Sequence, residues 1–104
     1  LEVQTSAGLV GLLHADCPCV SWSAMCDQLQ RQAPHELQEY CQWSRRRLKT
    51  DDERPIAGLR ALIVGHTPLS EVRVLGNIWH IDTGGWNRGH FSLLALDTLS
   101  LANA

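Results

Sequence analysis

The chain has 104 residues, of which 44% are hydrophobic and 19% are charged, and its formal net charge at pH 7 is -2. This length allows one small domain, and the composition is that of an ordinary globular protein. The weak negative charge excludes an electrostatic argument for nucleic acid or an anionic membrane as a partner. No stretch approaches the roughly 20 apolar residues of a membrane span, and we expect no signal peptide.

The first third of the chain predicts a β-hairpin followed by a loop. Two short β-like runs, residues 1–5 and 9–13, flank the turn-forming Ser6-Ala7-Gly8. Residues 16–21 contain a proline and two cysteines and predict a loop.

The middle of the chain predicts two helices. The first is capped by Ser21 or Ser23 and runs to about Gln32, before Ala33-Pro34 ends it. Because proline suits the first turn of a helix, the second is predicted from Pro34 to about Leu48.

The second half of the chain predicts β structure after a charged, solvated loop at residues 49–55. Gly76-Asn77 is a two-residue hairpin signal, and Thr83-Gly84-Gly85 must turn sharply. The predicted strands are residues 59–64, 72–75, 78–82 and 91–96, before a weakly organised tail. The pattern predicts an α+β fold with a mostly antiparallel second half.

Two histidines occupy similar positions at predicted strand ends. His14 follows Gly11-Leu12-Leu13, and His66 follows Ile63-Val64-Gly65; small or turn-forming residues come directly after each. Neighbouring strand ends are a common place for ligands, and neutral imidazole is a good ligand for manganese, iron or zinc. We therefore predict that both side chains bind one metal ion, although two histidines do not complete a site. The alternative is that each is a structural residue at the end of its strand.

Arginine and aspartate residues offer further candidates. Arg45, Arg46 and Arg47 either form a solvated helix end that opposes the helix dipole, or one of them binds phosphate through its planar fork. Asp82 either orients a ligating histidine or satisfies the backbone of the following turn, and the turn is favoured. Asp16 has the same two interpretations.

The tryptophans and His80 are interpreted mainly as structural residues. Core packing is the favoured interpretation for most of the tryptophans, with a base-stacking surface as the alternative. His80 alternates with a tryptophan inside a strand and is interpreted as a residue of a sheet face. The tryptophans are Trp22, Trp43, Trp79 and Trp86.

The four cysteines do not show the paired C-x-x-C spacing of a structural zinc site. They are Cys17, Cys19, Cys26 and Cys41. Because the chain has recognisable strands and helices, it does not need disulfides, and we expect reduced thiols in a cytoplasmic protein. One disulfide, or a metal-storing or sensing role for Cys17 and Cys19, remains an alternative.

An ordered set of motifs resembles the C-terminal half of bacterial and phage serine/threonine protein phosphatases. These are calcineurin-like metallophosphoesterases of the lambda phosphatase-like type. The motifs are Gly11–Asp16 with Trp22, Trp43-Ser44-Arg45, Gly65-His66-Thr67-Pro68, Gly76-Asn77 and Ile81-Asp82-Thr83-Gly84.

The resemblance implies a β-sandwich flanked by helices, with two divalent metals at one edge, usually manganese, with iron or zinc as alternatives. It implies that His14 and His66 ligate the same metal and that Arg45 contacts the substrate phosphate. In the family mechanism a metal-bridging water attacks phosphorus while both metals stabilise the charged oxygens.

The N-terminal motifs of that family, GDxHG, GDxxDRG and GNHE, do not occur in this chain. We therefore expect residues 1–104 to be the C-terminal portion of one domain, to need its N-terminal half as a partner, and to be inactive alone. Because the chain begins at Leu1 in a predicted strand without an initiator methionine, we expect it to be part of a longer polypeptide. A divided sandwich exposes strand edges, which predicts dimerisation through them.

The expected substrate is a phosphoprotein or a small phosphoester. A phosphohydrolase of dinucleoside polyphosphates shares the same metal motifs and is the alternative within the superfamily. A non-catalytic interaction module is the alternative from another functional class.

Overall fold

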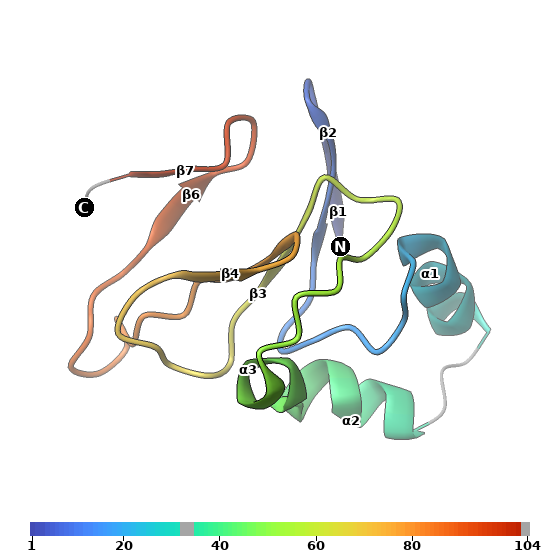
Figure 1. The fold of residues 1–104 in the computed structure, drawn as a ribbon, viewed down its shortest axis with the longest axis horizontal. Helices are drawn as coiled ribbons and strands as arrows, with labels where there is room; N and C mark the ends of the chain where they lie inside the picture. Colours follow the sequence, from blue (N-terminus) through green and yellow to red (C-terminus); the bar gives the residue numbers. More distant parts are fainter. Residues whose placement is uncertain (32–34, 103–104) are drawn as a thin grey trace.

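A five-stranded mixed sheet lies at the centre of the computed structural model, which describes residues 1–31 and 35–102 (Figure 1). Its strand order is β1-β2-β3-β5-β4. The strands are β1 (Glu2–Thr5), β2 (Gly8–Leu12), β3 (Ala61–Val64), β4 (Arg73–Leu75) and β5 (Ile78–His80). The predicted N-terminal hairpin is confirmed as the antiparallel pair β1–β2.

The prediction of a mostly antiparallel second half is confirmed for the two hairpins that follow β3 and fails for β3 itself, at the centre of the sheet. Strand β3 pairs in parallel with both β2 and β5, and all four of its residues are buried. A central strand covered on both faces is expected to be hydrophobic throughout, as Ala61–Val64 is. Antiparallel pairing is found for the β4–β5 hairpin, where Gly76 adopts a φ of 63° that favours glycine. The coarser prediction of mixed helices and strands is confirmed.

The first helix, α1 (Trp22–Gln30), begins where the sequence predicts. The Ser21 hydroxyl caps it by accepting a hydrogen bond of 3.2 Å from the Ala24 backbone N–H, so Ser21 rather than Ser23 is the cap. The predicted break at Ala33-Pro34 falls outside the described residues.

The second predicted helix is divided into two. Helix α2 (His35–Trp43) ends five residues before the predicted Leu48, and a separate short helix, α3 (Arg46–Thr50), follows. At the break between the two helices, the Ser44 hydroxyl accepts a hydrogen bond of 3.2 Å from the Arg46 backbone N–H. Because α3 reaches Thr50, the predicted solvated loop at 49–55 is shorter than expected.

The C-terminal tail forms a third hairpin, so the prediction of a weakly organised tail is wrong. Strands β6 (Leu93–Ala95) and β7 (Ser100–Ala102) are antiparallel, and Leu99 in their connection has a φ of 54°. Figure 1 shows this hairpin on the side of the sheet away from the helices. Leucines of this region pack beside Val10 and Ile63 on that face of the sheet.

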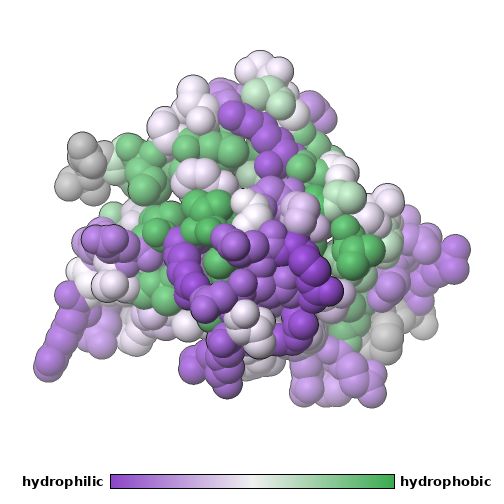
Figure 2. Space-filling model, in the orientation of Figure 1, coloured by the Kyte–Doolittle hydropathy of each residue, from purple (hydrophilic) through white to green (hydrophobic). Residues whose placement is uncertain are grey.

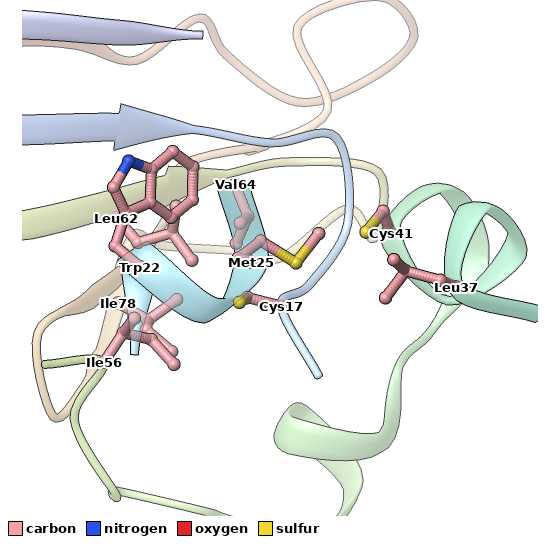
Figure 3. Packing of buried hydrophobic residues seen from close by; sticks show 9 residues of the cluster. All are labelled: Cys17, Trp22, Met25, Leu37, Cys41, Ile56, Leu62, Val64 and Ile78. Carbon is pink, nitrogen blue, oxygen red and sulfur yellow. The ribbon is translucent and has the colours of Figure 1, made fainter. Parts of the chain in front are cut away.

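The main hydrophobic core lies between the helices and the other sheet face (Figure 3). Met25 from α1 and Cys41 from α2 point toward Leu62 and Val64 of β3. The nine buried residues of this core are Cys17, Trp22, Met25, Leu37, Cys41, Ile56, Leu62, Val64 and Ile78. Burial of such side chains is the principal stabilisation of a small domain.

All four cysteines are free thiols. Burial raises the pKa of Cys17 to about 12 and that of Cys41 to about 11. Both thiols therefore stay protonated at neutral pH and serve as small hydrophobic residues.

The molecular surface has hydrophobic areas among hydrophilic ones (Figure 2). Strands β1 and β4 form the two edges of the five-stranded sheet, and dimerisation through these edges remains a prediction. None of the helices in residues 1–31 and 35–102 has the length and hydrophobicity needed to cross a membrane.

Candidate metal and phosphate site

His14 and His66 lie side by side at the end of the sheet where strands β2 and β3 terminate. Strands β2 and β3 are parallel neighbours, so the loops that follow them leave the sheet at the same end. The two imidazole centroids are 5.0 Å apart, with 52° between the ring planes. The Gly65 backbone N–H donates to the His14 carbonyl at 2.8 Å, which ties the two loops together.

This separation fits two imidazoles that share one ion. With metal–nitrogen bonds of about 2.1 Å and a roughly tetrahedral to octahedral angle, the ring centroids would be about 4.5–5.5 Å apart. The observed 5.0 Å lies within that interval. The two side chains are therefore already at a separation that suits binding to one metal ion.

The environment of His66 favours the neutral imidazole that a metal requires. Burial lowers the pKa of His66, with His14 and Arg45 adding to the effect and Asp82 opposing it. The His66 backbone has a φ of 72°, which is uncommon for a residue other than glycine. Strained backbone of this kind is often found at functional sites.

Within residues 1–31 and 35–102, no three histidine, cysteine, aspartate or glutamate side chains form a group able to hold a metal. Neither Cys17 nor Cys19 joins the two imidazoles in such a group. His14 and His66 therefore fit part of a coordination shell, and the described chain does not complete it.

The three consecutive arginines have different surroundings. Arg46 pairs with Asp52 at 3.2 Å, and the buried Arg47 pairs with Asp16 at 3.2 Å. The Arg45 backbone carbonyl accepts a hydrogen bond from the Lys49 N–H at 3.0 Å. Its side chain forms no hydrogen bond or ion pair with any other described residue, yet it is close enough to lower the pKa of His66. Arg45 is thus the arginine of the three that remains available for an anion beside the imidazoles.

The two aspartates have structural roles. Asp82 accepts a hydrogen bond of 3.0 Å from the Gly84 backbone N–H, which stabilises the turn after β5, and it also interacts electrostatically with His66. One oxygen of the buried Asp16 accepts from the Cys17 N–H at 2.7 Å and from Arg47. Its other oxygen has no hydrogen-bond partner among the described residues.

Trp43, which belongs to the motif Trp43-Ser44-Arg45 but for which core packing is the favoured sequence prediction, lies beside His66. It ends α2 and remains 65% exposed, so core packing is the wrong interpretation for it, as it is for the exposed Trp86. Its ring meets His66 at a centroid distance of 5.2 Å and an angle of 88°. A hollow of about 310 Å³ is lined by His14, Gln42 and Trp43. The sequence signal for this role was the position of Trp43 two residues before Arg45.

His80 lies in the core on the helix side of the sheet. It is 2% exposed, and neither ring nitrogen has a hydrogen-bond partner in the described part of the chain. Alternation in the strand indicates that it faces the same side as Ile78, which belongs to the helix-side core.

Three features lie together at this end of the sheet: a pair of neighbouring imidazoles, a guanidinium group without a side-chain partner among the described residues, and an exposed indole. The grouping of His14, His66, Arg45 and Trp43 is the basis for assigning a function, because no family model and no curated protein sequence matches this chain.

Proposed function

We propose that this chain is the C-terminal portion of a metal-dependent phosphoesterase of the calcineurin-like class, of the serine/threonine protein phosphatase type. The observation that carries the proposal is the 5.0 Å pairing of His14 and His66 beside the unpaired Arg45. The sheet between helices on one side and a β-hairpin on the other would then be part of the β-sandwich of that class.

His14 and His66 would each present a neutral ring nitrogen to the same divalent metal, with manganese as the first candidate and iron or zinc as alternatives. Bound metals in such sites lower the pKa of a water and stabilise the charge on phosphate oxygens. Arg45 would bind those oxygens with its planar donor fork and so position the phosphate group beside the imidazoles. Asp82, which holds the turn after β5, would help to orient His66.

Two imidazoles alone should bind manganese weakly, because Mn²⁺ stands low in the affinity order and prefers oxygen ligands. The proposal therefore includes further ligands from the N-terminal half of the same domain, and no hydrolysis by residues 1–104 alone. Its substrate would be a phosphoprotein or a small phosphoester in the cytoplasm.

Manganese is expected to affect His14 and His66 before other histidines. In a carbon–proton NMR spectrum of the full chain, substoichiometric Mn²⁺ should broaden the ring signals of these two residues first. His66→Gly removes the imidazole while suiting the φ of 72°, so the fold should be retained. We expect the variant to need at least about 10-fold more Mn²⁺ to broaden His14, since loss of even outer partners costs 10–100-fold in affinity.

The matched control is His35→Ala, because His35 is exposed on α2 and pairs only with Glu39 at 3.0 Å in the described chain. It should leave the response of His14 unchanged. Equal broadening of His35, His90 and His14 in the native chain would rule out the ligand assignment.

Arg45→Ala is expected to weaken binding of inorganic phosphate about 10-fold, because hydrogen bonds to a charged group contribute about 1.5–3 kcal/mol and this one is exposed. The measurement is a phosphate titration followed by the chemical shifts of residues around His66. Arg46→Ala removes the same charge from the next residue, but Asp52 already holds that guanidinium group, so this control should change the affinity little. Similar losses in both variants would show that net charge, and not the position of Arg45, governs binding.

A further inference from the structure

The backbone of His66 forms a tight turn. The Thr67 backbone N–H donates to the Gly65 carbonyl at 2.9 Å, and the φ of His66 between them is 72°. This turn fixes the direction in which the side chain leaves the backbone. The freedom that remains to the imidazole is therefore rotation about its two side-chain bonds.

The His66 ring has no hydrogen-bonded partner in the described part of the chain. Histidines that bind metals usually donate their second ring N–H to a carboxylate or a carbonyl, which fixes the rotation of the ring. Within residues 1–31 and 35–102, neither ring nitrogen of His66 makes such a bond. Asp82 interacts with His66 through its charge, while its Oδ1 accepts from the Gly84 backbone N–H. Contacts with neighbouring side chains are therefore left to orient the ring.

Two aromatic rings contact that of His66. The imidazole of His14 is 5.0 Å away at an angle of 52°, and the indole of Trp43 is 5.2 Å away at 88°. A perpendicular pair at this distance places the edge of one ring against the face of the other, which is a favoured aromatic arrangement. Rotation of the His66 side chain would break it. The His14 side chain is exposed, so the larger indole is the better restraint.

The backbone that carries Trp43 is held in place. Helix α2 buries Leu37 and Cys41 in the main core, and the Cys41 carbonyl accepts a hydrogen bond of 2.7 Å from the Ala15 N–H. Ala15 directly follows His14, so the helix is fixed to the loop that carries the other imidazole. The Trp43 side chain itself is 65% exposed and adds little to the core. This indole can therefore orient a neighbour without being needed for folding.

We propose that Trp43 is a positioning residue whose indole holds the His66 imidazole in the orientation in which His66 and His14 bind one metal ion. The inference rests on the proposed function, because that function supplies the metal. Trp43 would act on the metal through His66, and no contact with phosphate is required of it. Loss of the indole would weaken metal binding without removing a ligand.

The orientation of His66 in the metal-free chain provides the first test. The three-bond couplings about its Cα–Cβ bond and the chemical shifts of its ring protons are measured by NMR in the full chain. We expect one preferred rotamer in the native chain and averaged couplings in Trp43→Leu. Trp43→Phe keeps an aromatic ring and should retain the preferred rotamer. This measurement needs no metal, so its result does not depend on the proposed function.

A titration with Mn²⁺ alone provides the second test. In the native chain, the ring signals of His14 and His66 should broaden together. In Trp43→Leu, His66 should need about 3–10-fold more Mn²⁺, which corresponds to the loss of one aromatic pair, and Trp43→Phe should recover most of this loss. Trp86→Leu is the matched control, because Trp86 is 70% exposed but lines a different hollow with Pro68 and Arg88. It should change neither the rotamer nor the titration.

The two hypotheses fail in different ways. If Trp43→Leu left the Mn²⁺ response of His66 as in the native chain, the positioning role would be overturned while the ligand assignment stood. A change of rotamer without a change in the Mn²⁺ response would have the same meaning, since the contact would then be only structural. If Mn²⁺ did not broaden His14 and His66 preferentially in the native chain, the ligand assignment would fail and the positioning role with it.

Discussion

Replacing Arg47 by methionine is expected to lower the free energy of unfolding by about 3–5 kcal/mol, the usual effect of removing one partner from a buried ion pair. The Arg47 side chain is 7% exposed and its Asp16 partner 2% exposed. The Arg47 guanidinium group donates to Asp16 at 3.2 Å and to the carbonyls of Asp52 at 3.0 Å and Arg54 at 2.9 Å. Methionine keeps much of the apolar stem but leaves the Asp16 carboxylate buried without a countercharge.

Reversible urea unfolding at pH 7 measures this loss. Arg46→Met is the matched control: its partner is Asp52, but the Arg46 side chain is 51% exposed, so a loss below about 1 kcal/mol is expected. Adding Asp16→Asn to Arg47→Met should recover part of the stability by removing the unpaired charge. If the Arg46 and Arg47 variants lost the same amount, the buried pair would not have the role assigned to it.

The Arg47–Asp16 pair also connects the two segments that carry the candidate site. Asp16 is two residues after His14, and Arg47 is two residues after Arg45. The Ala15 N–H donates to the Cys41 carbonyl at 2.7 Å and fixes the same loop to α2. These contacts hold α3 against the loop after β2, so the distance between Arg45 and the imidazoles depends on a residue pair that touches neither.

Local signals explain most of what the sequence predicted correctly. Ser21 caps a helix with its own hydroxyl, and Gly76-Asn77 turns a hairpin through the conformational freedom of glycine. Both depend on residues a few positions apart. The sequence shows that His14 and His66 each follow a strand. The two residues meet because β2 and β3 are parallel neighbours, which the local sequence does not show.

The features that were missed depend on long-range contacts. Arg45, Arg46 and Arg47 are chemically identical, and only the fold decides that one is buried on Asp16, one pairs on the surface and one stays unpaired. Alternation indicated that His80 lies on a sheet face but not that helices cover that face. Likewise, the hydrophobic run of β3 carries no information about whether its neighbours are parallel.

His80 is expected to make the protein less stable by about 3 kcal/mol as the pH falls from above 6.5 to about 4. Burial lowers the pKa of its imidazole from the ordinary 6.5 to about 4; Asp16 opposes this shift, while Arg47 and Arg73 add to it. Neither ring nitrogen has a partner among the described residues that would stabilise the charged form.

The sign follows from which state binds the proton first. As the pH falls below about 6.5, the unfolded chain takes up a proton on His80, whereas the folded chain does so only near pH 4. Protonation of the unfolded state favours unfolding throughout that interval. Above pH 6.5 both states are neutral at this position, and below pH 4 both are protonated, so the contribution is constant outside the interval.

Comparison of the native chain with His80→Phe isolates this effect, because carboxylates that titrate in the same interval are common to both. The phenyl ring fills similar space without a titrating group, and it also removes two buried nitrogens that lack partners, so the variant should be at least as stable at pH 7. The difference in unfolding free energy between variant and native chain, measured in urea from pH 8 to pH 4, should grow by about 3 kcal/mol on acidification. A difference that stays constant with pH would mean that Asp16 stabilises a protonated His80 in the fold and that burial does not govern this imidazole.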